Sequence, residues 1–132
     1  MQFTISIETN KKYGLYDITH LVEEKLKSSD KKGSLINVYV QGATAGIMIQ
    51  ENWDDSVQND VINLLNKLIP QGIWEHDLQD NNGAAHLKAG IVGPSETIPL
   101  INGEMGLSTW QNIFLCEFDG PRKSRRIIIT LI

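Results

Sequence analysis

Short β-branched segments separated by turn residues recur along this chain and favour a fold built from sheets. Residues 2–8 alternate apolar and polar side chains, which is typical of a half-buried strand. Residues 34–40 and 44–50 are short and rich in β-branched side chains, and only residues 41–43 separate them, so they also favour strands over helices. Residues 125–132 form a last apolar strand. With the segments described next, about eight strands are predicted, which indicates a mainly antiparallel sheet structure.

The second half of the chain contains further candidate strands. Residues 84–91 are compatible with a helix or a strand, and a strand is preferred because the run is short and glycines bracket it. Residues 96–100 precede Asn102-Gly103, a pair typical of a tight hairpin because both positions tolerate positive φ. Residues 107–118 then form a long strand, which Asp119-Gly120-Pro121 ends.

Two helices are predicted among these strands. Residues 17–28 carry one apolar stripe with spacings of three and four, and the acid at the first position can cap the helix. Residues 55–69 carry a second stripe, in which Asp55 and Gln58 have the spacing of a capping box, and Pro70 ends the helix. The expected fold is therefore α+β and mainly β. It is a compact, jelly-roll-like sandwich of mostly antiparallel strands with two flanking helices, formed by one domain over residues 1–132.

Size and charge exclude several classes of protein. A chain of 132 residues with 41% hydrophobic content is suited to one domain with one core. The formal net charge of −4 argues against binding to nucleic acid, and no apolar run approaches the roughly 20 residues that would cross a membrane. The single cysteine, Cys116, fits a reducing compartment and is interpreted as a small buried hydrophobic residue. A cytoplasmic protein is expected.

The three histidines differ in their sequence context. His20 lies beside the apolar stripe of the first helix, where a half-exposed structural residue is expected. His76 and His86 flank an Asn-rich loop, and loops between ordered elements can hold side chains over a cleft. Imidazole can bind a metal or carry a proton near neutral pH, but nine intervening residues match no zinc signature. The residues alone leave a structural role and a role in a site both open.

Several charged residues could complete such a site. Glu51 lies at a strand end, and Glu117 and Asp119 end the long strand. An inward-pointing Glu117 would need a partner, which Arg122, Arg125 or a histidine could supply. These acids can equally be solvated strand-end residues.

The long strand and the turn after it leave two further alternatives. Phe114, Cys116 and Phe118 would face the core, while Gln111 and Glu117 would lie on the opposite face. The basic residues 122–126 are either a solvated hairpin or an anion subsite.

The motifs of the second half resemble a known family. The segment "WEHD", followed by "NNGAAHLKAGIVGPSETIPLINGEMGLSTWQNIFLCEFDGPR", resembles the YjbQ-like family of small bacterial and archaeal proteins. The resemblance extends upstream through "GATAGIMIQEN" and "DITHLVEEKL" and so covers nearly the whole chain. Members of this family are sometimes described as having a secondary thiamine-phosphate synthase activity.

The resemblance implies a homotrimer with a polar pocket built around three histidines. His76 and His86 correspond to the second and third of these, whereas the first falls on Gly42. Loss of one imidazole is expected to weaken a site for a divalent metal such as zinc. Other family positions are retained: Thr44, Glu51, Asn82, Thr109, Trp110, Gln111, Glu117, Asp119 and Arg122.

Three functions are consistent with these residues. In a thiamine-phosphate synthase-like enzyme, His76 and His86 would act as acid and base, Glu117 or Asp119 would orient an imidazole, and cations would hold phosphate groups. The expected substrate-binding residues are Thr44, Glu51, Asn82, Lys88, Trp110, Gln111, Arg122 and Arg125. Alternatively, the chain binds a metal through His76 and His86, or a small phosphorylated ligand or another anion, without transforming it. The third possibility is a homo-oligomer with a decayed, non-catalytic pocket.

Overall fold

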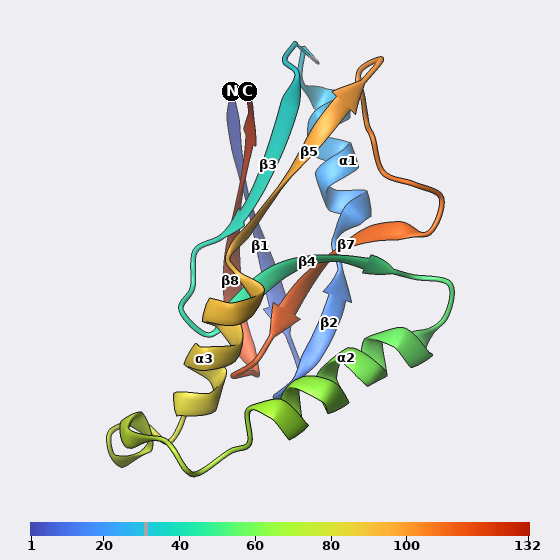
Figure 1. Ribbon diagram of the computed structural model, residues 1–132. Coiled ribbons are helices and arrows are strands. Elements are labelled where there is room, and N and C mark those ends of the chain that lie inside the picture. The colour runs from blue at the N-terminus through green and yellow to red at the C-terminus, as the bar shows by residue number, and fades with distance from the viewer. Residues whose placement is uncertain (31) are drawn as a thin grey trace.

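Two antiparallel sheets form most of the structure (Figure 1). The computed structural model describes residues 1–30 and 32–132. The first sheet has the strand order β1 (Gln2–Thr9), β8 (Arg122–Leu131), β3 (Leu35–Val40), β5 (Ser95–Ile101) and β6 (Glu104–Met105). The second sheet has the order β2 (Gly14–Asp17), β7 (Gln111–Glu117) and β4 (Ala45–Glu51). The fold is α+β and mainly β, as the sequence predicts.

Strands that are distant in the chain are neighbours in both sheets. β8 lies between β1 and β3, and β7 lies between β2 and β4. The two chain ends therefore lie side by side, with Gln2 opposite Thr130 (Figure 1). This alternation between early and late strands is the jelly-roll-like arrangement that the sequence predicts.

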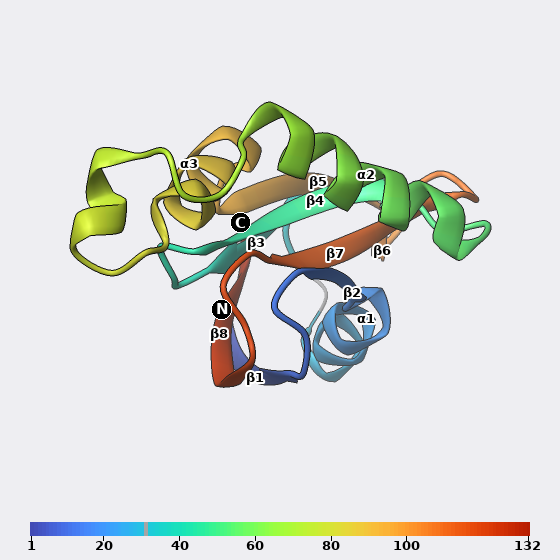
Figure 2. The same cartoon turned by 90° about the horizontal axis from the view of Figure 1, so that it is seen from below.

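The helices cover the second sheet on both faces. α1 (Thr19–Ser28) lies on one side, and α2 (Asp55–Leu68) and α3 (Gly83–Val92) lie on the other (Figure 2). A 3₁₀ turn, η1 (Glu75–Leu78), precedes α3. Within the described ranges 1–30 and 32–132, no helix is long and apolar enough to cross a membrane.

The prediction of a strand over residues 84–91 is wrong, because these residues belong to α3. Ala85, Ala89 and Val92 recur at helical spacing and pack with Leu65 of α2 and Cys116 of β7. Their small side chains let the helix lie close to β4. A Cβ atom at Gly46 would lie only 2.9 Å from Val92 Cγ1, so glycine is needed for this approach. Tertiary packing therefore determines the secondary structure of a segment whose sequence pattern is compatible with a helix or a strand.

The start of β7 and the cap of α2 also differ from the prediction. Residues 107–110 form a turn before β7, in which the Gln111 side chain accepts a hydrogen bond from the Ser108 backbone N–H. Asp54, and not Asp55, caps α2, because its carboxylate accepts a hydrogen bond from the Ser56 N–H at 2.7 Å. β7 therefore begins at Gln111 and not at residue 107, whereas α2 begins at Asp55 as predicted and only its capping residue lies one position earlier.

From Ile113 onward, β7 is buried on both faces. Phe114, Cys116 and Phe118 are buried as predicted, but Leu115 and Glu117 on the opposite face are fully buried too. Burial raises the pKa of the Cys116 thiol to about 12, so the thiolate does not form near neutral pH. This confirms the interpretation of Cys116 as a buried hydrophobic residue.

Candidate functional site

The structure places His76 of η1 beside His86 of α3. The centroids of the two imidazole rings lie 4.8 Å apart, and the ring planes cross at 84°. Both rings line a hollow of about 600 Å³, which is called the histidine hollow below. Its lining consists of Ile73, Trp74, Glu75, His76, Gly83, His86 and Leu87. Two side chains that are separated by nine residues in the sequence thus meet at one surface.

Asp77 holds the two histidine-bearing segments together. One carboxylate oxygen accepts a hydrogen bond from the Trp74 N–H at 3.0 Å, and the other accepts one from the Gly83 N–H at 2.8 Å. These two backbone hydrogen bonds lower the pKa of Asp77. A Cβ atom at Gly83 would lie 2.8 Å from Trp74 Cβ, so the glycine permits the close approach. The sequence analysis missed Asp77, although an acid three residues after Trp74 is a capping signal.

An acid also lies beside His76. Asp80 Oδ2 lies 3.5 Å from His76 Nε2, and both side chains are partly exposed. Among residues 1–30 and 32–132, no group of three or more histidine, cysteine or acidic side chains is arranged to hold a metal. The histidine hollow therefore offers two imidazoles, and further ligands would have to come from water, a small molecule or another chain.

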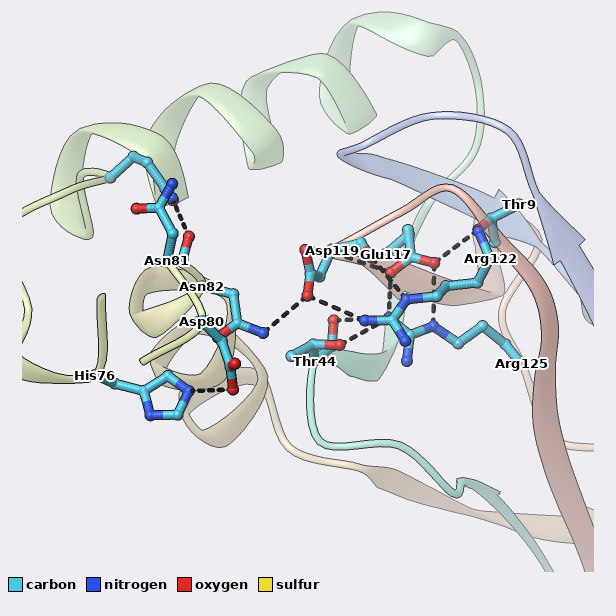
Figure 3. A network of polar contacts seen from close by, with 11 residues as sticks. Thr9, Thr44, His76, Asp80, Asn81, Asn82, Glu117, Asp119, Arg122 and Arg125 are labelled. Carbon is cyan, nitrogen blue, oxygen red and sulfur yellow. Dashed lines mark hydrogen bonds and ion pairs between the residues drawn. The ribbon is translucent and has the colours of Figure 1, made fainter. Parts of the chain in front are cut away.

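Glu117 belongs to a different cluster, the Arg125 network, which consists of Thr9, Thr44, Glu117 and Arg125 (Figure 3). The Arg125 guanidinium donates to both carboxylate oxygens of Glu117, at 3.0 and 2.5 Å, and to Thr44 Oγ1 at 2.8 Å. Thr9 Oγ1 donates to Glu117 at 2.7 Å. Burial alone would raise the pKa of Glu117, but these hydrogen bonds and the positive charge of Arg125 outweigh it and lower the pKa. The partner of Glu117 is thus Arg125 and not a histidine.

Asp119 connects the Arg125 network to α3. Its backbone N–H donates to Glu117 Oε2 at 3.1 Å, and its carboxylate accepts hydrogen bonds from Asn82 and Arg122, both at 3.0 Å. Asn82 precedes α3, and its carbonyl accepts from the His86 N–H. In Figure 3, Asn82 points to Asp119, while His76 contacts Asp80 away from the Arg125 network.

Three predicted site residues lie elsewhere in this chain. Glu51 is the last residue of β4 and lies opposite Gln111 in β7. Thr44 precedes the other end of β4, so the backbones of Glu51 and Thr44 are roughly 20 Å apart along the strand. Trp110 is half exposed and packs edge-to-face on Trp53, with a centroid distance of 4.7 Å. One carboxylate oxygen of Glu51 is buried without a hydrogen-bond partner among the described residues. Within one chain, Glu51, Trp110 and Gln111 do not join the residues around His86.

Gly42, Lys88 and His20 complete the placement of the predicted residues. A Cβ atom at Gly42 would lie 2.9 Å from Arg125 Nη1, so this position adjoins the Arg125 network, and it does not line the histidine hollow. Lys88 is buried and contacts Asn66. His20 lies in α1 and contacts Glu24, and its side chain is more exposed than the half-exposed position that the sequence predicts.

Comparisons with known proteins agree over nearly the full length. The family model described as "UPF0047 protein YjbQ-like" matches residues 3–132. A UPF0047 protein of Methanocaldococcus jannaschii is 44% identical over 123 residues, which cover 93% of this chain and 88% of that protein. UPF0047 protein YugU of Bacillus subtilis is 39% identical over 122 residues and covers 90% of each chain.

Solved structures show the same fold. A YbjQ-like protein of unknown function from Sulfolobus solfataricus has a TM-score of 0.93 at 33% identity, covering 98% of this chain and 94% of that one. A hypothetical protein from Aeropyrum pernix has a TM-score of 0.94 at 32% identity, covering 100% of this chain and 98% of that one.

Proposed function

The chain belongs to the UPF0047 family of YjbQ-like proteins, and we propose that it binds a divalent metal ion weakly through His76 and His86. The observation that supports this most directly is the contact between the two imidazole rings in the histidine hollow. Two imidazoles that share a tetrahedral zinc ion have ring centroids about 5 Å apart. The separation of 4.8 Å is compatible with such a pair after small ring rotations.

The proposed affinity is low because the chain offers few ligands. The family histidine is replaced by Gly42, whose position adjoins the Arg125 guanidinium and not the histidine hollow. Asp80 lies 3.5 Å from His76 Nε2, but among the described residues it does not form a three-residue ligand group with the two histidines. The remaining positions would be filled by water or by a bound small molecule. A metal held in this way would act as a Lewis acid and lower the pKa of its bound water.

Zinc titration of the protein without a histidine tag tests the proposal. His86→Ala is expected to weaken zinc binding by at least about tenfold, because only one imidazole remains in the hollow. The matched control is His20→Ala, which removes an exposed histidine outside the hollow and should leave the affinity unchanged. Equal zinc affinities for the wild type and His86→Ala would contradict the proposal.

A second proposal is a thiamine-phosphate synthase-like activity in the same region. Arg122 supports it, because its partly exposed guanidinium is held by Asp119, which is also bonded to Asn82 before α3. An arginine in this position can hold a phosphate group, and an imidazole can carry a proton.

Complementation of a strain that lacks thiamine-phosphate synthase tests this activity. The wild type and His20→Ala are expected to restore growth, and His76→Ala is expected to fail while remaining folded. Growth with His76→Ala as fast as with the wild type would rule out the assigned role of this residue, and no growth with the wild type would rule out the activity.

An apolar surface beside the histidine hollow supports contact between copies of this chain, for which the family resemblance implies a homotrimer. Large apolar side chains of α2, α3 and the segment between them are exposed, by 41% for Leu87 up to 90% for Leu78. They are Leu64, Leu68, Ile73, Leu78, Leu87 and Ile91. Exposed apolar surface of this kind is typical of subunit interfaces. A second copy that covers it would also close the histidine hollow, because Ile73 and Leu87 line that hollow.

Ile91→Asp is expected to convert the proposed trimer into monomers, because a buried carboxylate in the interface has no partner. The control is Ile132→Asp, which charges an isoleucine of similar exposure at the chain end. Light scattering after size-exclusion chromatography gives the mass of both variants. A monomeric wild type, or a trimeric Ile91→Asp protein, would refute this interface.

A further inference from the structure

Lys88 lies on the side of α3 that faces away from His86. Two residues along a helix correspond to a rotation of about 200°, so the two side chains point in nearly opposite directions. The Lys88 side chain is 2% exposed, and its ammonium group donates a hydrogen bond to Asn66 Oδ1 of α2 at 2.5 Å. The same ammonium lies 4.5 Å from the centroid of the Tyr13 ring. Lys88 therefore does not line the histidine hollow, although the sequence analysis grouped it with the substrate-binding residues expected there.

The buried ammonium lacks a counter-charge. Throughout residues 1–30 and 32–132, no carboxylate lies within ion-pair distance of Lys88. A second cation is close instead, because the Lys12 ammonium lies 5.7 Å from the same Tyr13 ring. Burial, and to a smaller extent Lys12, lower the pKa of Lys88. A buried cation without an anionic partner is costly, and binding sites are places where this cost is accepted.

A polar hollow of about 600 Å³ lies between α2 and the segment that contains Tyr13, and Tyr13 is the residue that it shares with this cluster, because Lys88, Lys12 and Asn66 do not line it. We call it the lysine hollow. Lys11, Tyr13, Asn59 and Asn63 contribute to its lining, and Asp55 is the single acid among its lining residues. Asn59, Asn63 and Asn66 recur at spacings of four and three and so share one face of α2. The amide groups on this face can donate hydrogen bonds to oxygen atoms of a ligand.

We propose that the lysine hollow binds a small oxyanion such as phosphate, with Lys88 as its buried cation and Lys11 and Lys12 as its exposed cations. The oxyanion supplies the negative charge that the buried ammonium lacks, and the asparagine amides hold its remaining oxygens. The Tyr13 ring covers the ammonium and turns aside when the anion binds. This site is separate from the histidine hollow, because α3 carries Lys88 and His86 on opposite faces.

Titration with inorganic phosphate, followed by the backbone amide NMR signals, tests the proposal. In the wild type, the amides of residues 11–14 and 58–66 are expected to shift together. Lys88→Met keeps the apolar stem and removes the charge, and it is expected to weaken phosphate binding by about tenfold or more. Lys12→Met is expected to weaken it by about threefold. Lys67→Met removes an exposed charge near the end of α2 and should change nothing.

Three outcomes would overturn the proposal: no phosphate-dependent shifts, shifts confined to residues 122–126, or equal affinities for Lys88→Met and Lys67→Met. Should Lys88→Met fail to fold, the comparison between Lys12→Met and Lys67→Met decides, because both charges are exposed. Zinc titration of Lys88→Met keeps this test apart from the metal proposal, because zinc affinity should remain at the wild-type value.

Discussion

Arg125→Met is expected to lower the free energy of unfolding by about 3–5 kcal/mol, because it leaves the fully buried Glu117 carboxylate without its cation. Domains of this kind are stable by only about 5–15 kcal/mol, so the loss is a large share of the total. Urea unfolding at neutral pH measures it. The matched control is Arg126→Met, since Arg126 is the exposed neighbour in β8 and its removal should cost less than about 1 kcal/mol.

The pH dependence of stability distinguishes the ion pair from simple packing. In the wild type, the pKa of Glu117 is lowered, so its contribution is present above the unfolded-state value near 4.3 and is lost as the pH falls through the folded-state value. In Arg125→Met, burial raises the pKa of Glu117, so this variant should become more stable as the pH falls from 7 towards 5. The double variant Glu117→Leu/Arg125→Met should recover much of the stability. Identical pH profiles for the wild type and Arg125→Met would contradict the account.

Gly42→His is expected to destabilise the protein by about 1–3 kcal/mol and not to complete a metal site. A Cβ atom at position 42 would lie 2.9 Å from Arg125 Nη1, and the guanidinium cannot easily move because Glu117 and Thr44 hold it. The new imidazole would start beside a cation and outside the histidine hollow, so zinc affinity should stay within about threefold of the wild type.

Gly42→Ala separates the steric effect from the imidazole. It places the same Cβ atom against Arg125 and should account for most of the lost stability. In the Arg125→Met background, Gly42→His should lower the free energy of unfolding by less than it does in the wild type, because the guanidinium that the new Cβ atom would meet is absent. A Gly42→His protein as stable as the wild type, with zinc bound more than about tenfold more tightly, would show that position 42 belongs to the metal site.

Local sequence patterns were sufficient to predict most strands and two helices. They failed to predict the helix over residues 84–91, whose secondary structure depends on tertiary packing. Residues 84–91 have no strong periodicity because small residues dominate, and they become helical through packing on β4 and Leu65. The ambiguity mattered for function, because only a helix places His86 and Lys88 on opposite faces. A strand would have put both side chains on the same face.

The partners of charged residues were less predictable than the elements that carry them. The sequence showed that a buried Glu117 needs a cation, but it left Arg122, Arg125 and a histidine as alternatives. The choice follows from side-chain direction in β8, where Arg125 is buried and Arg122 is exposed, and residue spacing near a turn does not fix this direction. The contact between His76 and His86 likewise depends on Asp77, whose two backbone partners lie on separate segments.

The most direct test of the central claim, that His76 and His86 form one site, is to follow the imidazole C2–H NMR signals during zinc addition. The chain contains three histidines, so each signal can be assigned by one substitution. The account predicts that the signals of His76 and His86 change together with one midpoint, while the signal of His20 remains in place. Different midpoints for His76 and His86, or an equal response of all three signals, would contradict it.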